Sequence, residues 1–166
     1  MDAPQLSREI ESFLATVHVM SLATCADDGS AHAASLFFAV DGLSLVWTSD
    51  PAARHSRHLE SRPRVAATVA PDCADFMDVR GLQIAGSARR LHGDAELGRA
   101  RQAMRKRYPF LNALATAAQA LRTAHERAGY YRLDPERMTL IDNSRGFGHK
   151  ETLQLLADGT LAGTAS

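Results

Sequence analysis

The sequence predicts a mainly β, α+β domain in which six antiparallel strands form a small, closed or partly closed barrel with flanking helices. Three observations support this class. Apolar residues alternate over six short runs, tight turns join most of these runs, and segments with helical spacing precede and separate them. Short turns favour antiparallel pairing, because parallel strands need long crossover connections.

The first part of the chain predicts one helix and three strands. Apolar residues recur at steps of three and four at Leu6, Ile10, Phe13, Leu14 and Val17. Residues 18–25, 31–40 and 43–48 then alternate, with an Asp-Asp-Gly turn and an Asp-Gly turn between them. We expect these three strands to form an antiparallel meander.

A short helix should follow the third strand. Ser49 or Asp50 is a good N-cap and Pro51 suits the first helical position, while Pro63 blocks extension beyond about Ser61. Strands are expected at 65–70 and 79–91, and Gly81 and Gly86 in the second of them indicate a bulge or a close backbone approach.

The last third predicts two helices and the sixth strand. Asp94 and Glu96 open a helix that closes on Arg105, Lys106 and Arg107, which is the charge order favoured by the helix dipole. A helix at 111–127 and a strand at 130–142, kinked near Pro135, follow. We expect one domain over residues 1–157 and a flexible tail at 158–166.

Composition excludes several classes of protein. The 166 residues are 45% apolar and 23% charged, which is ordinary for a folded domain. The 19 basic residues match 19 acidic ones, so a nucleic-acid partner is not expected. There is no apolar run long enough to span a membrane and no signal-like start, so we expect a cytoplasmic protein.

Hydroxyl, arginine and histidine side chains concentrate in residues 47–59. They are Trp47, Thr48, Ser49, Arg54, His55, Arg57 and His58. A helix start offers free N–H groups to an anion, and guanidinium groups bind phosphate oxygens in a bidentate manner. A phosphate monoester is the ligand that fits. The alternative is a solvated helix whose Arg and His side chains face water.

Other motifs are weaker. His55 and His58 are three residues apart, but no third ligand stands at a telling spacing, so no metal site is expected. Neither a phosphate loop nor a GxSxG motif is present, and no side chain stands out as catalytic. Gln83 is either an edge-strand amide in water or a buried amide that needs a partner. Phe147 lies in an Asn- and Gly-rich turn, either a plain loop or a lid over a flat ligand.

The chain resembles the pyridoxamine 5'-phosphate oxidase-like, FMN-binding split-barrel family. The resemblance runs from about residue 6 to 155 and rests on the order of elements and on four segments, Trp47-Thr48-Ser49, Arg54 to Leu59, Pro63-Arg64-Val65 and Gly86 to Leu91. The segment from Asp142 to Gly148 looks like a small bacterial subgroup of that family.

The resemblance implies a six-stranded split barrel that forms a homodimer with FMN at the subunit interface. Thr48, Arg54 and His55 match the family's phosphate-binding positions, although the family commonly has Lys where this chain has His55. Ser35 and Leu36 match the second-strand positions that line the isoalloxazine, and Gln83 lies on a strand that faces the flavin from either subunit. We therefore expect a cofactor site built from Ser35, Leu36, Trp47, Thr48, Ser49, Arg54, His55, Arg57, His58, Gln83 and Phe147.

The resemblance favours an FMN-dependent oxidoreductase that acts on a small molecule, with NAD(P)H as a candidate electron donor. The chain lacks the Arg-x-His-Asp-Arg type segment that binds the substrate phosphate in pyridoxamine 5'-phosphate oxidases, so that activity itself is not expected. Two alternatives stay open: a flavin carrier or sensor without turnover, and a split barrel that binds the deazaflavin F420 or haem. The compact basic cluster favours FMN over the longer F420 tail.

Overall fold

The computed structural model describes residues 1–116 and 118–165, apart from the side chains at positions 114–116, 120, 124 and 125. Its helices are α1 (Ala3–Thr16), α2 (Arg54–Ser61), α3 (Asp94–Arg107) and α4 (Gln119–Arg127), with 3-10 turns η1 (Phe76–Asp78), η2 (Pro109–Thr116) and η3 (Asn143–Arg145). Its strands are β1 (Val19–Cys25), β2 (Ala31–Phe37), β3 (Ala39–Asp41), β4 (Ser44–Ser49), β5 (Arg64–Val69), β6 (Arg80–Arg90), β7 (Gly129–Asp142), β8 (Lys150–Leu155) and β9 (Leu161–Ala165).

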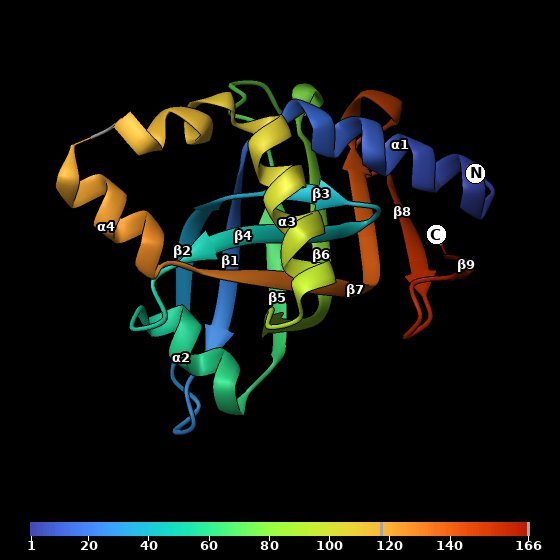
Figure 1. Ribbon diagram of the computed structural model, residues 1–166. Helices are drawn as coiled ribbons and strands as arrows, with labels where there is room; N and C mark the ends of the chain where they lie inside the picture. Colours follow the sequence, from blue (N-terminus) through green and yellow to red (C-terminus); the bar gives the residue numbers. More distant parts are fainter. Residues whose placement is uncertain (117, 166) are drawn as a thin grey trace.

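All strands belong to one antiparallel sheet that curls into a half-barrel (Figure 1). The strand order is β2-β1-β5-β6-β7-β4-β3, and β8 and β9 continue from β7 as a branch. The two ends of this path, β2 and β3, are separated in sequence only by Phe38. Since one residue joins the two ends, the sheet must curl back on itself. The predicted antiparallel split barrel with flanking helices is confirmed.

The junction between β2 and β3 is fixed by Tyr108. Its hydroxyl donates to the carbonyl of Phe38 at 2.6 Å and lies 2.9 Å from the carbonyl of His18. Phe38 itself is fully buried. A tyrosine that follows α3 thus binds both backbone carbonyls at the closing point, adding to the long backbone hydrogen bond that Phe38 N–H donates to the His18 carbonyl at 3.3 Å.

The long strand β7 serves two halves of the sheet. Its first residues pair with β4 and its last with β8, while β6 pairs with it throughout. The register shifts between Ala85 and Gly86, where a Cβ on Gly86 would lie 2.2 Å from the carbonyl oxygen of Asp134. Only glycine fits there, which confirms the bulge predicted from the glycine in this strand.

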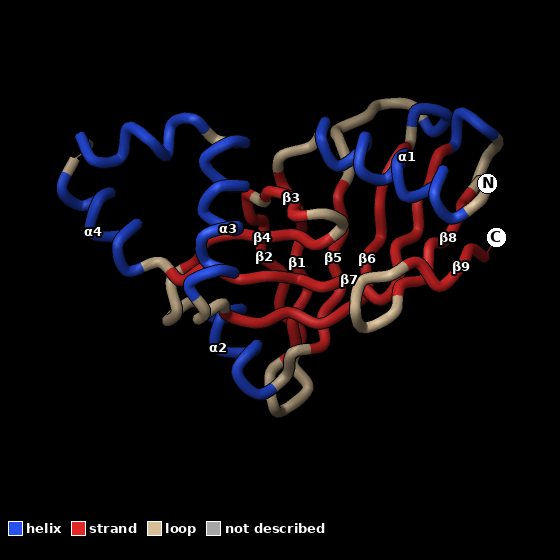
Figure 2. Tube along the Cα trace, turned by 45° about the vertical axis from the view of Figure 1, so that its right-hand side comes forward, coloured by secondary structure: helices blue, strands red, loops and turns tan. Residues whose placement is uncertain are grey.

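The helices lie at the rim of the sheet. Figure 2 shows α1 near one end of the strands, α2 at the opposite end, and α3 beside α4 along one side. The main core fills the curl and takes in the buried face of α1 at Leu6, Ile10, Phe13 and Leu14. A second, smaller core packs α3 against the outer side of β3 and β4, through residues such as Met104, Ala39 and Val46.

The structure departs from the sequence prediction in strand count and pairing. The predicted strand at 31–40 is divided at Phe38 into β2, which pairs with β1, and β3, which pairs with β4. Both antiparallel pairings of the predicted meander therefore form, but they lie at opposite ends of the strand path, and β4 pairs on its other side with β7. The Asp41-Gly42 turn does form the β3–β4 hairpin, with Gly42 at φ +63°. Two strands were not predicted: β8, and β9 in the segment expected to be a flexible tail at 158–166.

Two predicted helices also change. The segment at 111–127 is divided into η2 and α4, and residue 117 lies outside the described residues. α2 begins at Arg54 rather than at Pro51. The reason is that the Asp50 carboxylate accepts from the backbone N–H of Ala52 at 2.8 Å and so caps a separate turn ahead of the helix.

Candidate functional site

Helix α2 separates its polar side chains into two sets. His55, Ser56 and Leu59 are buried against the sheet, whereas Arg54 and Arg57 are exposed. The helix has Ala53 as its N-cap and therefore no side-chain cap hydrogen bond. Its first turn contains no acidic residue. Free N–H groups and two guanidinium groups thus lie together at one helix end, which favours an anion.

Three imidazole rings cluster where α2 packs on β1 and β2. The rings of His32 and His55 are parallel with centroids 6.2 Å apart, and the ring of His58 meets that of His32 edge-on at 5.9 Å. Two hydroxyl groups hold the rings of α2. Ser49 Oγ lies 2.6 Å from His55 Nε2, and Thr24 Oγ1 lies 3.0 Å from His58 Nδ1.

His55 is neutral near pH 7 in this setting. Burial lowers the pKa of His55 from its ordinary value of 6.5, and the positive charges of His32 and His58 lower it further. Only 7% of the residue is exposed. A neutral His55 offers one donor and one acceptor nitrogen, and a bound dianion would reverse the shift by favouring the protonated ring.

Carboxylates approach this cluster without forming an ion pair with it in the described part of the chain. Hydrogen bonds, first of all from Ser61 and Ser30, lower the pKa of Asp27 and Asp28, and the charge of His58 lowers the pKa of both further. Among the described residues, no ion pair reaches Arg54, Arg57 or His58, although the structure contains thirteen ion pairs elsewhere. In addition, the hydroxyl of Ser56 is buried without a hydrogen-bond partner. These features fit the phosphate of the FMN that the resemblance implies, because a phosphate dianion needs several donors and cannot share its site with carboxylates. Arg54, Arg57 and His58 would hold it.

The predicted residues of β4 do not lie on one face. Trp47 is fully buried in the main core and its ring stacks on that of Tyr131, with centroids 5.7 Å apart, so its side chain does not face a ligand site. Ser49 has the same orientation along the strand and reaches His55. Thr48 alternates to the other face, beside the buried Val46 that packs toward α3. The structure therefore brings Ser49, rather than Thr48, to the basic cluster.

The predicted residues of β2 are close to the cluster in the chain. Leu36 is half-buried and shares the face of His32, whereas Ser35 is exposed on the opposite face of this edge strand. Both remain candidates for contact with a flat ring, each from a different side of β2.

Gln83 and Phe147 lie apart from α2. Gln83 is exposed on β6 and lines an open cavity of about 530 Å³ on the outer sheet face, together with Thr68, Thr139 and Thr152. Phe147 is 78% exposed and lies between η3 and β8, in a segment that pairs with neither β2 nor α2. The structure does not bring either residue to the basic cluster of the same chain.

Two residues of the cluster were missed by the sequence interpretation. His32 and Thr24 stand more than twenty residues before α2, and their spacing gives no signal of proximity. The usable signal was the alternation of β2, which predicts that His32 shares the face of Leu36.

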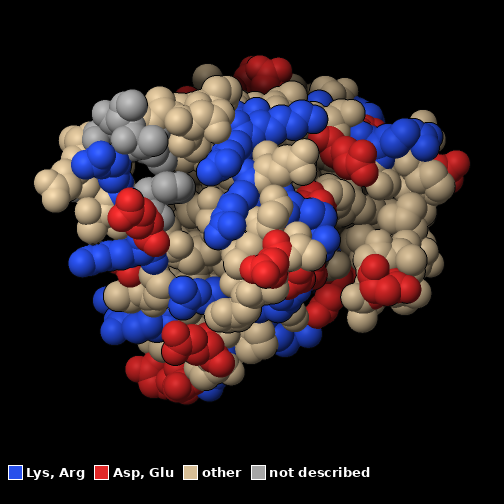
Figure 3. Space-filling view, viewed as in Figure 1, with Lys and Arg blue, Asp and Glu red and all other residues tan. Residues whose placement is uncertain are grey.

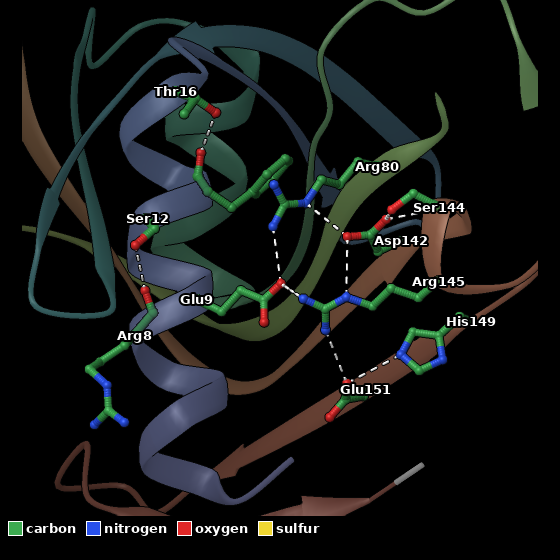
Figure 4. Close-up of polar contacts among 11 residues, drawn as sticks. Arg8, Glu9, Ser12, Thr16, Arg80, Asp142, Ser144, Arg145, His149 and Glu151 are labelled. Carbon is green, nitrogen blue, oxygen red and sulfur yellow. Dashed lines mark hydrogen bonds and ion pairs between the residues drawn. The ribbon is translucent and has the colours of Figure 1, made fainter. Parts of the chain in front are cut away.

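A second charged cluster lies under α1 and has the opposite character (Figure 4). Glu9 accepts from Arg80 at 3.1 Å and from Arg145, Asp142 pairs with both arginines, and Glu151 pairs with Arg145 at 3.4 Å. Burial raises the pKa of Asp142, but hydrogen bonds from Ser144 and the two arginine charges outweigh it, so the net shift is downward. The N-terminal amine also pairs with Glu151, at 3.0 Å. This α1–β8 clamp, Glu9, Arg80, Asp142, Arg145 and Glu151, thus has its three carboxylates balanced by two arginines and that amine, and it serves structure.

Two further observations concern sites and membranes. Over residues 1–116 and 118–165, no three His, Cys, Asp or Glu side chains are grouped to hold a metal ion. No helix in the part of the chain described by the structure is both long and apolar enough to cross a bilayer.

Comparison with known proteins places this geometry in a family. Residues 6–144 match the family described as pyridoxamine 5'-phosphate oxidase. The UPF0306 protein of Serratia proteamaculans is 29% identical over 154 residues, which cover 90% of this chain and 96% of that protein. The UPF0306 protein of Klebsiella pneumoniae is 30% identical over 143 residues, covering 85% and 88%.

Solved structures with this fold include haem proteins. The haem-binding protein of Mycobacterium smegmatis superposes with a TM-score of 0.70 at 21% identity, over 89% of this chain and 57% of that one. The haem storage protein of Vibrio cholerae gives 0.63 at 22% identity, over 79% and 90%. Because the sequence identities are only 21% and 22%, these two comparisons show that the fold is shared and nothing more. With most of its length matched, the chain belongs to the pyridoxamine 5'-phosphate oxidase family and, within it, with the bacterial UPF0306 proteins.

Proposed function

We propose that this protein binds FMN, with the phosphate at the N-terminal end of α2, and acts as an oxidoreductase on a small molecule. One observation carries the proposal. α2 begins without a side-chain cap, and neither its two exposed arginines nor His58 forms an ion pair with any described residue. Since unpaired charges near one another repel, such a cluster is stable only with an anion or in open water.

The residues divide the work of holding the phosphate. Arg54 and Arg57 provide guanidinium donors, and the first-turn N–H groups of α2 add the helix dipole. His58 is oriented by Thr24, and His55 by Ser49. A buried, neutral His55 in the position where the family commonly has Lys gives this site a pH-dependent ligand in place of a permanent charge.

The flavin ring requires a binding surface in addition to the phosphate site. We propose that two subunits of a homodimer form this surface together. Ser35 and Leu36 on β2 are the candidates from one subunit, and Gln83 from the other, because Gln83 does not lie at α2 of its own chain. β2 is an edge strand, and Phe37 on it is 57% exposed beside Val19 at 39%. An exposed apolar edge of this kind is a surface that a second copy would cover.

The bound flavin would supply hydride and electron transfer, while the protein holds it and shapes the space for a substrate. No side chain of the α2 cluster is assigned as a general acid or base. NAD(P)H is the electron donor we propose. A flavin carrier without turnover uses the same site and differs only in lacking that reaction.

Haem is the second candidate, favoured by the His32, His55 and His58 rings and by the haem proteins that share the fold. Histidine is a common axial ligand of haem iron. Against this, Ser49 occupies Nε2 of the buried His55, so that ring is not available through this nitrogen; His58, whose contact with Thr24 is on Nδ1, keeps Nε2 for a ligand. An F420 site is disfavoured because the unpaired basic residues are compact.

The visible spectrum of the purified protein, with FMN or haem added in turn, separates these candidates. The proposal expects the visible absorption bands of oxidised flavin on the protein, and bleaching of those bands by NADH or NADPH. A Soret band with no retained flavin would replace FMN by haem. Retained flavin that neither nucleotide reduces would leave the carrier as the function.

A further inference from the structure

A second basic cavity lies on the α3 side of the molecule, and no residue of α2 lines it, although Gly129 and Tyr130 in its lining pair with Ser49 and Thr48 of β4. Its volume is about 390 Å³, within the range of small-molecule sites. Residues from β6, α3 and the start of β7 line it, including Arg90, His92, Arg101, Arg105 and Tyr130. Figure 3 shows Lys and Arg side chains gathered along α3, which occupies the centre of this view.

The arginines of this cavity differ from their sequence neighbours. Arg89 pairs with Glu96 at 2.5 Å, and Arg99 pairs with Asp41 at 3.7 Å. By contrast, no ion pair is formed by Arg90, Arg101 or Arg105 with any described residue. The lining contains three arginines and a single carboxylate, that of Glu126. The cavity therefore has an excess of positive charge. Arginines a few residues away in the sequence form ion pairs with carboxylates, whereas the arginines of the cavity form none within the described part of the chain.

Two of the three guanidinium groups are held in place. The Arg101 guanidinium lies over the ring of Tyr130, 5.7 Å from its centroid. The Arg90 side chain lies across Gly129, where an added Cβ would be only 2.9 Å from Arg90 Nε. Stacking and close packing reduce the entropy that a ligand must remove, so these donors are preorganised.

The basic surface continues past the cavity. Arg101 and Arg105 also line an adjoining, more open hollow with Gln102, Lys106 and Asn112, and that hollow has no carboxylate in its lining. Arg101 and Arg105 thus line both the cavity and the adjoining hollow. A ligand larger than one anionic group therefore has room to extend along α3.

We propose that the α3 cavity, defined by Arg90, His92, Arg101, Arg105 and Tyr130, binds a small organic dianion, either a phosphate monoester or a dicarboxylate. Three guanidinium groups against one carboxylate leave two positive charges, which a dianion neutralises. The site is distinct from α2 and does not depend on FMN being bound there.

Calorimetric titration of the full chain tests the proposal with two probes, phenyl phosphate and succinate. Both are titrated into the wild type, into Arg101→Gln/Arg105→Gln, and into Arg54→Gln/Arg57→Gln. We expect at least one probe to bind the wild type and to lose affinity tenfold or more in the first variant. Because phenyl phosphate can also occupy α2, the Arg54→Gln/Arg57→Gln variant isolates the α3 cavity, and the probe should still bind there. The probe that binds decides between the phosphate and dicarboxylate sources.

The matched control is Arg89→Gln, which removes a neighbouring guanidinium that already has a partner and should leave probe affinity unchanged. Circular dichroism checks that each variant is folded. Absence of binding by both probes would overturn the proposal. So would equal affinity in Arg101→Gln/Arg105→Gln, or a loss confined to Arg54→Gln/Arg57→Gln, which would assign the binding to α2.

Discussion

The α1–β8 clamp and the α2 cluster contain similar residues in opposite arrangements. In the clamp, Arg80 and Arg145 each contact two or more carboxylates, and the N-terminal amine adds a contact to Glu151 at 3.0 Å. In the α2 cluster, Arg54 and Arg57 form no ion pair with a carboxylate of any described residue. Paired arginines join elements of this fold, here α1, β6, η3 and β8. The arginines beside the buried His55 join no elements in this way, and this difference is the basis of our proposal that they serve a ligand.

The largest effect should come from removing the unpaired charges. Arg54→Gln/Arg57→Gln should weaken FMN binding about 100-fold, roughly 3 kcal/mol, because two charge-assisted contacts are lost. The urea midpoint should stay unchanged, since neither side chain forms an ion pair with a described residue. FMN fluorescence titration measures the affinity, and Arg8→Gln, an exposed arginine on α1, is the control. Unchanged affinity in the double variant would show that the phosphate lies elsewhere.

The paired cluster should respond in the reverse way. Glu9→Gln leaves Arg80 and Arg145 facing each other with one carboxylate fewer, and should cost about 1–2 kcal/mol of folding free energy. Solvent screening keeps the cost below that of a buried pair, because the two arginine side chains are 39% and 38% exposed. Urea denaturation measures the loss, with Glu11→Gln as the exposed control on the same helix. If Glu9→Gln were as stable as the wild type but bound FMN less tightly, the clamp would serve the ligand rather than the fold, and the contrast with the α2 cluster would be wrong.

A smaller effect is expected from pH. Because the pKa of His55 is lower in the folded protein than in the unfolded chain, the unfolded chain binds more protons as pH falls below 6.5. Stability without ligand is therefore full above that pH and declines toward the lowered pKa. Beyond burial, the charges of His32 and His58, which face His55, also lower its pKa, whereas the Ser49 hydroxyl that contacts the ring carries no charge.

His55→Gln should flatten that decline, and His92→Gln, an exposed histidine, should not. Thermal denaturation between about pH 5 and 7.5 compares the slopes, and added FMN should reduce the wild-type slope because a phosphate favours the protonated ring. An equal slope in wild type and His55→Gln would assign the pH dependence to other groups.

Much of the fold follows from local sequence patterns. The stripe of α1, the charge order of α3 and the glycine bulge at Gly86 are each found in the structure. The C-terminal hairpin could also have been predicted, since Leu153 and Leu155 alternate and an Asp-Gly turn at 158–159 follows. Pairing of β4 with β7 could not, because the partners are more than eighty residues apart and no short-range rule connects them.

The candidate site was predictable only in part. The basic run on α2 is contiguous in sequence, and the structure keeps Arg54, His55, Arg57 and His58 together. The prediction for Trp47 was wrong because it assumed that a residue next to the polar end of the strand also faces the ligand. In the structure its ring is buried in the main core. His32 and Thr24 come to α2 through tertiary packing, which the sequence does not encode at any fixed spacing.

The most direct test compares FMN with riboflavin, which differ only in the phosphate. If the unpaired charges of α2 hold that phosphate, the wild type should bind FMN at least 100-fold more tightly than riboflavin in parallel fluorescence titrations. In Arg54→Gln/Arg57→Gln this preference should collapse toward equality. A wild type that binds riboflavin as tightly as FMN would contradict the claim that α2 is a phosphate site.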